Sequence, residues 1–135
     1  MGPVLPAAIR PEDKGGAHHG GDDMPIYLTQ GRFSREAISG MIENPEDRAV
    51  AVSKLAKASG AKPLGYYLTF GESDFLVILE SDGPVTDTMA ALLTAGSAGG
   101  VSDLRTTVAV TSKEGMKAMA KAKTIRKGFR PAGQK

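Results

Sequence analysis

The chain has 135 residues, of which 41% are hydrophobic, so it can bury one core, and its length favours one domain with tails over two domains. It contains no cysteine, which excludes disulfides, thiolate catalysis and cysteine-ligated zinc and is compatible with the cytoplasmic location that we expect. Its apolar runs are too short for a membrane span or a secretory signal, so we expect no membrane partner.

The formal net charge of +2 is distributed unevenly along the chain. Residues 111–135 contain eight Lys or Arg and one acid, which gives +7 there and leaves −5 for residues 1–110. Such a basic segment is either a solvated tail, which is the commoner outcome, or a contact for an anionic partner such as nucleic acid or an acidic protein surface. Of these partners, we do not expect nucleic acid.

Residues 1–23 combine three Pro with five Gly and show no periodicity, which predicts a disordered extension. His18 and His19 lie near Asp22 and Asp23, but glycine-rich flanks cannot position ligands, so we expect no metal site. The folded domain is then predicted over residues 24–123, with a basic flexible tail at residues 124–135.

The domain begins with a predicted strand at residues 25–31, where Ile26 and Leu28 alternate with Tyr27 and Thr29. Ser34 can then act as the N-cap of a helix, because its hydroxyl can accept a bond from a free backbone N–H of the first turn.

Pro45 cannot lie inside that helix, so we expect the helix to restart. Asn44 is the expected cap of the second helix, with Pro45 in its first turn, and Gly60 is the expected left-handed residue at its end. Its apolar stripe is predicted to consist of Ala49, Val52, Leu55 and Ala56.

A β-hairpin follows, with strands predicted at residues 62–70 and 74–80 around the turn at residues 71–74. Glu72 and Asp74 lie in this turn, but two carboxylates without further oxygen ligands make a poor cation site. We therefore favour turn chemistry for both, with Asp74 bonded to local backbone and Glu72 solvated.

Pro84 begins another predicted helix, which fades into a glycine-rich segment at residues 95–100. That segment follows a helix and lacks a Gly-Lys-Ser/Thr sequence, so we interpret it as a helix end and loop rather than a phosphate cradle. The buried stripe of the helix is predicted to be Val85, Met89, Leu92, Leu93 and Gly96.

The last strand is predicted at residues 104–110. Thr111 and Glu114 then have the spacing of a capping box and predict a short amphipathic helix. Met116 and Met119 on this helix are interpreted as packing residues rather than as a ligand clamp.

This order of elements predicts an α+β fold of the ferredoxin-like βαββαβ type: a four-stranded antiparallel sheet, helices on one face, and a short C-terminal helix. The side chains expected to face the helices are Ile26, Leu28, Tyr66, Leu68, Leu104 and Val108. Those expected on the open face are Tyr27, Thr29, Tyr67, Thr69, Arg105 and Thr107.

The strand after the hairpin turn is apolar on both faces, because Leu76 and Ile78 alternate with three other apolar residues. Such a strand must be covered on both faces. Apart from the short C-terminal helix, the chain offers no element for the second cover. We therefore predict that two copies pack sheet to sheet, as a homodimer or a higher oligomer.

Residues 24–110 resemble the GYD-domain family, of the dimeric α/β-barrel superfamily of ferredoxin-like proteins. The matching features are Ile26-Tyr27-Leu28-Thr29, Tyr66-Tyr67-Leu68-Thr69-Phe70-Gly71-Glu72-x-Asp74, the run from Phe75 to Leu79 closed by Glu80, the helix after Pro84, and Leu104-Arg105-Thr106. Ser73 stands where the name-giving tyrosine is expected. The resemblance implies a ferredoxin-like fold that forms dimers or larger rings. The superfamily includes cofactorless monooxygenases, isomerases, haem-degrading enzymes and stress-responsive proteins, so the fold does not select a reaction.

The folded domain contains no histidine, which excludes a histidine base, a histidine haem ligand and a Ser-His nucleophile. Glu80 is the candidate catalytic residue, since a carboxylate held on the partner-facing side of the sheet could act as a base. The alternative is a solvated Glu80, or one paired with Arg32 or Arg105. The side chains predicted to bind a ligand are Tyr27, Tyr67, Ile78, Glu80 and Arg105.

Three functions are compatible with these observations. The first is a homo-oligomer that binds a small apolar or aromatic ligand without a cofactor. The second is a cofactor-independent isomerase or monooxygenase that uses Glu80 or a tyrosine as acid or base. The third is an interaction module that docks an anionic partner through its basic C-terminal tail.

Overall fold

The structure, a computed structural model, describes residues 24–134, and the predicted extension at residues 1–23 lies outside this range. The strands are β1 (Ile26–Phe33), β2 (Lys62–Leu68), β3 (Phe75–Glu80) and β4 (Val101–Ala109). The helices are α2 (Arg35–Glu43), α3 (Arg48–Ala58), α4 (Val85–Ser97) and α5 (Ser112–Ile125), followed by the 3-10 turn η1 (Arg126–Gly128).

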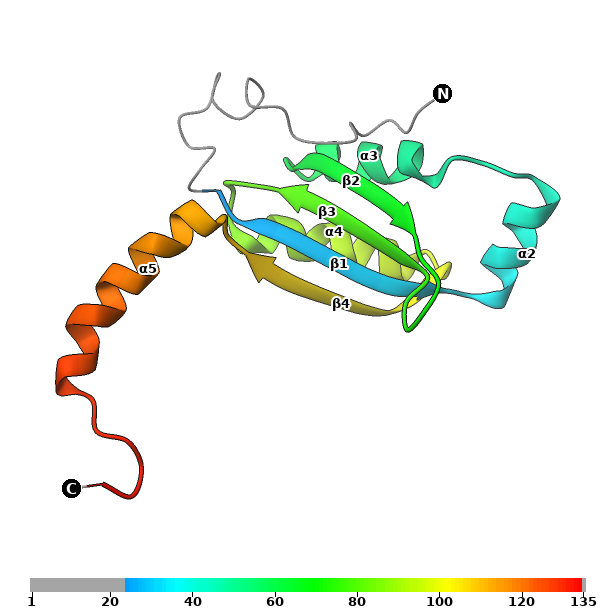
Figure 1. Ribbon diagram of the computed structural model, residues 1–135. Helices are drawn as coiled ribbons and strands as arrows, with labels where there is room; N and C mark the ends of the chain where they lie inside the picture. Colours follow the sequence, from blue (N-terminus) through cyan, green and yellow to red (C-terminus); the bar gives the residue numbers. More distant parts are fainter. Residues whose placement is uncertain (1–23, 135) are drawn as a thin grey trace.

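The four strands form one antiparallel sheet in the order β2-β3-β1-β4. Helices α3 and α4 lie behind this sheet in Figure 1, against β2 and β4 respectively. The α+β, ferredoxin-like arrangement predicted from the order of the elements is therefore confirmed.

The strand β1 presents the opposite face to the one predicted from its alternation. Tyr27 and Thr29 face the helices and are buried, while Ile26 and Leu28 lie on the open face. Both pairs carry apolar groups, so alternation alone could not choose between the two faces. The interior position of Thr29 is compatible with its hydroxyl, because its Oγ1 lies 2.8 Å from Thr106 Oγ1 and forms a hydrogen bond with it.

The capping signals at the start of α2 and at the end of α3 are confirmed. Ser34 Oγ accepts a hydrogen bond from the backbone N–H of Ala37 at 3.0 Å, and Gly60 has a φ of 88°. The restart between the two helices differs from the prediction, because Asn44 ends α2 instead of beginning α3. Asp47 is the cap of α3, and its Oδ1 accepts from Ala49 N–H at 3.0 Å.

Helix α4 is rotated relative to the stripe predicted for it. Thr88 and Ala91 are its buried residues, whereas Val85, Met89 and Leu93 are exposed. The helix carries apolar residues around most of its circumference, so periodicity gave a poor indication of the buried face. As a result, small side chains of α4 face the sheet.

The hairpin turn is anchored to the neighbouring end of β1. The carboxylate of Asp74 accepts a hydrogen bond from Phe33 N–H at 2.9 Å, and Asp74 N–H donates to the carbonyl of Gly31 at 2.7 Å. Turn chemistry for Asp74 is therefore correct, although its partner is 41 residues away in the chain and not local. Gly31 has no room for a side chain, because an added Cβ would lie 2.7 Å from Phe75 Cζ.

Helix α5 extends away from the sheet (Figure 1). Its predicted cap is confirmed, since Thr111 Oγ1 accepts from Glu114 N–H at 3.0 Å. Met116 and Met119 do not pack on the domain as predicted, since they are 64% and 67% exposed. The open face of the sheet is thus not covered by α5. None of the helices within residues 24–134 combines the length and the apolar character that crossing a bilayer requires.

Candidate functional site

The predicted ligand-binding residues lie on both faces of the sheet. Tyr67, Ile78, Glu80 and Arg105 are on the open face, whereas Tyr27 is in the core on the helix-facing side. On the open face, Tyr67 and Arg105 are in one row of cross-strand partners, and Glu80 is four residues along β3 from that row. The structure therefore does not bring all five side chains together.

Glu80 is 6% exposed and lies between Lys62 of β2 and Ile26 of β1 in the strand register. The alternative in which it is solvated, or paired with Arg32 or Arg105, is not what the structure contains. Both arginines instead contact the hairpin turn, near the opposite end of β3.

Arg32 and Arg105 hold the turn that resembles the GYD pattern. Arg32 Nη1 donates to the carbonyl of Glu72 at 3.0 Å, and Arg105 Nη2 donates to Ser73 Oγ at 3.3 Å. Arg32, Glu72 and Arg105 line an open hollow of about 420 Å³, together with Asp103 and Leu104. Ser73 is buried here, so a compact hydroxyl occupies the position where the pattern would place a phenol. The turn therefore accepts one hydrogen bond from each of the two arginines.

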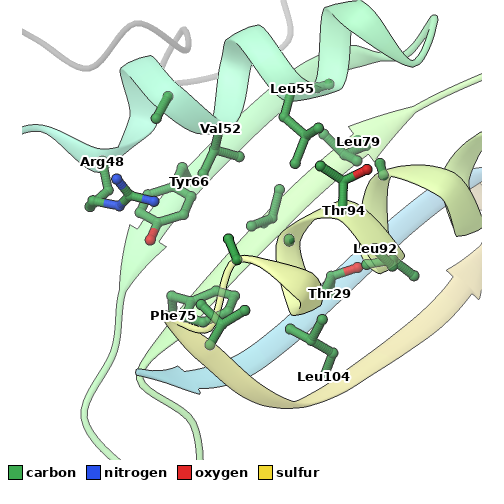
Figure 2. Close-up of a pocket in the computed structure, with 18 of the residues that line it drawn as sticks. Thr29, Arg48, Val52, Leu55, Tyr66, Phe75, Leu79, Leu92, Thr94 and Leu104 are labelled. Carbon is green, nitrogen blue, oxygen red and sulfur yellow. The ribbon is translucent and has the colours of Figure 1, made fainter. Parts of the chain in front are cut away.

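A second candidate site lies on the other face, between the sheet and helices α3 and α4. This apolar cavity has a volume of about 330 Å³. Its walls are built largely from small and aliphatic side chains of both helices and from alternate residues of the strands (Figure 2). The labelled lining residues of Figure 2 are Thr29, Arg48, Val52, Leu55, Tyr66, Phe75, Leu79, Leu92, Thr94 and Leu104.

The small residues of the two helices explain why the space is open. Ala56 of α3 and Ala91 of α4 are buried beside the cavity, and Ala95 lines it one turn after Ala91. None of these methyl groups reaches far from its helix, and the larger Leu93 points to solvent. A gap between two helices and a sheet that larger side chains do not fill is the usual origin of a ligand pocket in a small domain.

Aromatic rings form one end of the cavity. The ring centroids of Phe33 and Phe75 are 5.1 Å apart, and those of Tyr66 and Phe75 are 6.1 Å apart with nearly parallel planes. These separations are typical of favourable aromatic pairs. A flat apolar ligand would extend this stack.

A polar pair, Arg48 and Tyr66, lies at the same end, and Figure 2 shows the guanidinium beside the phenol. The Arg48 guanidinium lies next to the Tyr66 phenol, and its Nη1 forms an ion pair with Glu46 Oε2 at 2.7 Å. Burial raises the pKa of the Tyr66 phenol above its ordinary value of 10.0. The charge and the polar contact of Arg48 lower this pKa, and the nearby Asp47 and Glu46 raise it.

The raised pKa of Tyr66 predicts a loss of stability at alkaline pH. Above the ordinary value of 10.0 the unfolded chain releases the Tyr66 proton before the folded chain does, so the folded state binds more protons and its stability falls as the pH rises. The free energy of unfolding should therefore decrease between neutral pH and about pH 11. We expect this decrease to be smaller in Tyr66→Phe than in the parent, because the variant lacks this phenol. Urea titrations at the two pH values measure this, and an identical loss in both proteins would contradict it.

The matched control is Tyr67→Phe. Tyr67 is the neighbouring tyrosine on the open face, with 45% of its surface exposed. Tyr67→Phe removes a phenol that lies outside the cavity, so its alkaline loss of stability should stay close to that of the parent.

Sequence reasoning placed Tyr66 correctly on the helix-facing side, but neither Tyr66 nor Arg48 was among the predicted site residues. Arg48 is on α3 and Tyr66 is on β2, 18 positions later, and no spacing motif joins them. The available signal was indirect. Alternation along the strands placed both Tyr66 and Leu104 on the helix-facing side of the sheet, and both residues line the cavity.

Comparison with known proteins gives one match. The family model described as GYD domain matches residues 27–120, which span β1 through most of α5. Neither the curated proteins nor the solved structures contain a match to this chain. Because the family model covers well over half of the sequence, including the anchored hairpin turn and every strand, the chain belongs to the GYD-domain family.

Proposed function

We propose that this protein binds a small apolar or aromatic ligand in the cavity between its sheet and helices α3 and α4, and that it does so as a sheet-to-sheet homo-oligomer. The observation that carries the proposal is the apolar cavity of about 330 Å³ with an aromatic end. Ligand sites in proteins are typically concave and mostly apolar, with a few polar groups that orient the ligand. Here those polar groups are Arg48, Tyr66, Thr29 and Thr94.

The size of the cavity limits the ligand. An engineered apolar cavity of about 150 Å³ accommodates benzene. The cavity in this protein is about 330 Å³, which is roughly twice that volume. A ligand with two fused rings, or an aliphatic group of similar size, therefore suits it.

The oligomeric part of the proposal is supported by the open face of the sheet. Leu28, Leu76 and Ile78 lie together there, and none of the described helices covers them. They are half-buried in a single chain, and the neighbouring Tyr67 is 45% exposed. A second copy would bury an apolar strip through a self-complementary contact between identical faces.

The second candidate is a cofactor-independent isomerase or monooxygenase, supported by the position of the Tyr66 phenol in the cavity lining. A phenol that keeps its proton in the cavity can act as a proton donor to a bound molecule. Glu80 is less suited to this role, since it belongs to the opposite face of the sheet and does not line the cavity. The enzyme hypothesis therefore rests on Tyr66.

A titration of the full chain with naphthalene tests the proposed function. Backbone amide shifts in a proton–nitrogen correlation spectrum should saturate and should concentrate near Val52, Leu55 and Leu92, while α5 stays unaffected. Inositol, which has a similar size but a polar surface, is the control and should cause no such shifts. Shifts that fail to saturate, or that spread over the exposed surface, would contradict ligand binding in this cavity.

A further inference from the structure

We infer that the ligand is an aromatic carboxylate whose charged group lies between Arg48 and Tyr66, while its ring occupies the apolar cavity. This inference rests on the proposed function, because it concerns the chemistry of a ligand in the same cavity. It adds the charge of the ligand and the residues that recognise that charge.

The charge of the lining favours an anionic ligand group. Among the described residues that line the cavity, Arg48 is the one charged side chain, and none is Asp or Glu. A guanidinium keeps its positive charge at all physiological pH values. At the edge of an apolar cavity this charge favours a negative ligand group, and it disfavours a cationic one.

Arg48 and Tyr66 also offer several hydrogen-bond donors to a ligand. Arg48 carries five N–H groups, and its contacts with Glu46 and Tyr66 do not use all of them. The Tyr66 hydroxyl lies next to Arg48 and has its own hydrogen to donate. A planar carboxylate can accept from both side chains, and it matches the fork of a guanidinium better than a single polar atom does.

Two carboxylates near Arg48, outside the cavity lining, would repel a ligand anion. Glu46 is the ion-pair partner of Arg48, and Asp47 lies next to it in sequence. The side chains of Arg48 and Glu46 are 34% and 47% exposed, so solvent weakens their interaction. A ligand carboxylate on the sheltered side of the guanidinium therefore competes with a weak, exposed pair.

The aromatic end of the cavity lies beside Arg48. Tyr66 contacts Arg48 and also stacks on Phe75 at a centroid separation of 6.1 Å. A ligand whose carboxylate meets Arg48 consequently has aromatic rings beside its own first ring (Figure 2). This arrangement favours a carboxylate attached directly to an aromatic ring over one at the end of a flexible chain.

The test uses three probes with the same bicyclic ring: naphthoate, the neutral naphthalenemethanol and the cationic naphthylmethylamine. Affinities are measured by amide shifts of the full chain at low and high salt. We expect naphthoate to bind about tenfold or more tightly than the alcohol, and the amine to bind most weakly. Equal affinities for naphthoate and the alcohol would overturn this inference but leave the proposed function intact. No saturable binding of any probe would overturn both.

Variants of Arg48 identify the recognising group. Arg48→Met should lower the affinity for naphthoate about tenfold more than it lowers the affinity for naphthalenemethanol. Lys54→Met removes one positive charge from the exposed side of the same helix and should change the two affinities equally. If naphthoate keeps its advantage in Arg48→Met, Arg48 is not the recognising residue and the inference fails.

A second variant covers the case in which Arg48→Met does not fold. Arg48→Lys keeps the charge but cannot form the forked contact with a carboxylate. It should weaken naphthoate several-fold and leave the order of the three probes unchanged. An unchanged naphthoate affinity in this variant would overturn the assignment of Arg48.

Discussion

Ala95→Phe is expected to abolish naphthalene binding, with a loss of affinity of about a hundredfold or more. Ala95 lines the cavity from α4, one turn after the buried Ala91. A benzyl group at this position occupies the space that the ligand needs. Amide-detected titration of the parent and the variant with naphthalene measures the effect.

The same substitution should stabilise the protein, because the new ring buries apolar surface in a space that is open in the parent. Cavity-filling changes of this kind typically add about 0.5–2 kcal/mol to the free energy of unfolding. Urea unfolding measures this gain. Leu93→Phe is the matched control on the same helix, since Leu93 is 71% exposed and points away from the cavity. Unchanged affinity in a stabilised Ala95→Phe would show that the ligand binds elsewhere.

Ile78→Arg is expected to convert the proposed sheet-to-sheet oligomer into a folded monomer. Ile78 lies beside Leu28 on the open face, in the middle of the apolar strip that a second copy would cover. An arginine there places an unpaired charge in the interface, which costs about 3 kcal/mol or more and weakens association by about a hundredfold or more. Light scattering after gel filtration measures the mass of each species.

The control for this prediction is Leu93→Arg, which adds the same charge at an exposed position of α4. It should leave the mass of the oligomer unchanged. Circular dichroism must give the same helix and strand content for both variants. A parent protein that is itself a monomer at micromolar concentration would remove the argument for sheet-to-sheet association.

Local sequence signals determined most of the secondary structure, because each acts within a few residues. The hydroxyls of Ser34 and Thr111 cap the helices that follow them, as predicted. Gly60 ends α3 in a conformation that glycine adopts easily. The exception is the break between α2 and α3, where Asn44 and Asp47 are both residue types that cap helices. Asn44 was the predicted cap of α3, but Asp47 is the cap that the structure contains.

The order of these elements also determined the fold, because a βαββαβ chain has few ways to bury one apolar face of an antiparallel sheet. Residues of β3 are apolar on both sides, so either face of that strand could contact the helices. The correct placement of Tyr66 and Leu104 toward the helices followed from alternation alone.

What the tertiary structure decided was which face of β1 and of α4 is buried, and where the apolar cavity lies. Tyr27 is buried opposite Leu79, and the Thr29 hydroxyl finds a partner on β4, contacts that no local pattern encodes. Arg48 and Tyr66 meet only after α3 lies against β2. The sequence by itself determined the elements and their order, since those depend on neighbouring residues. The site depends on side chains that packing brings together, and for that reason it was visible only in the folded protein.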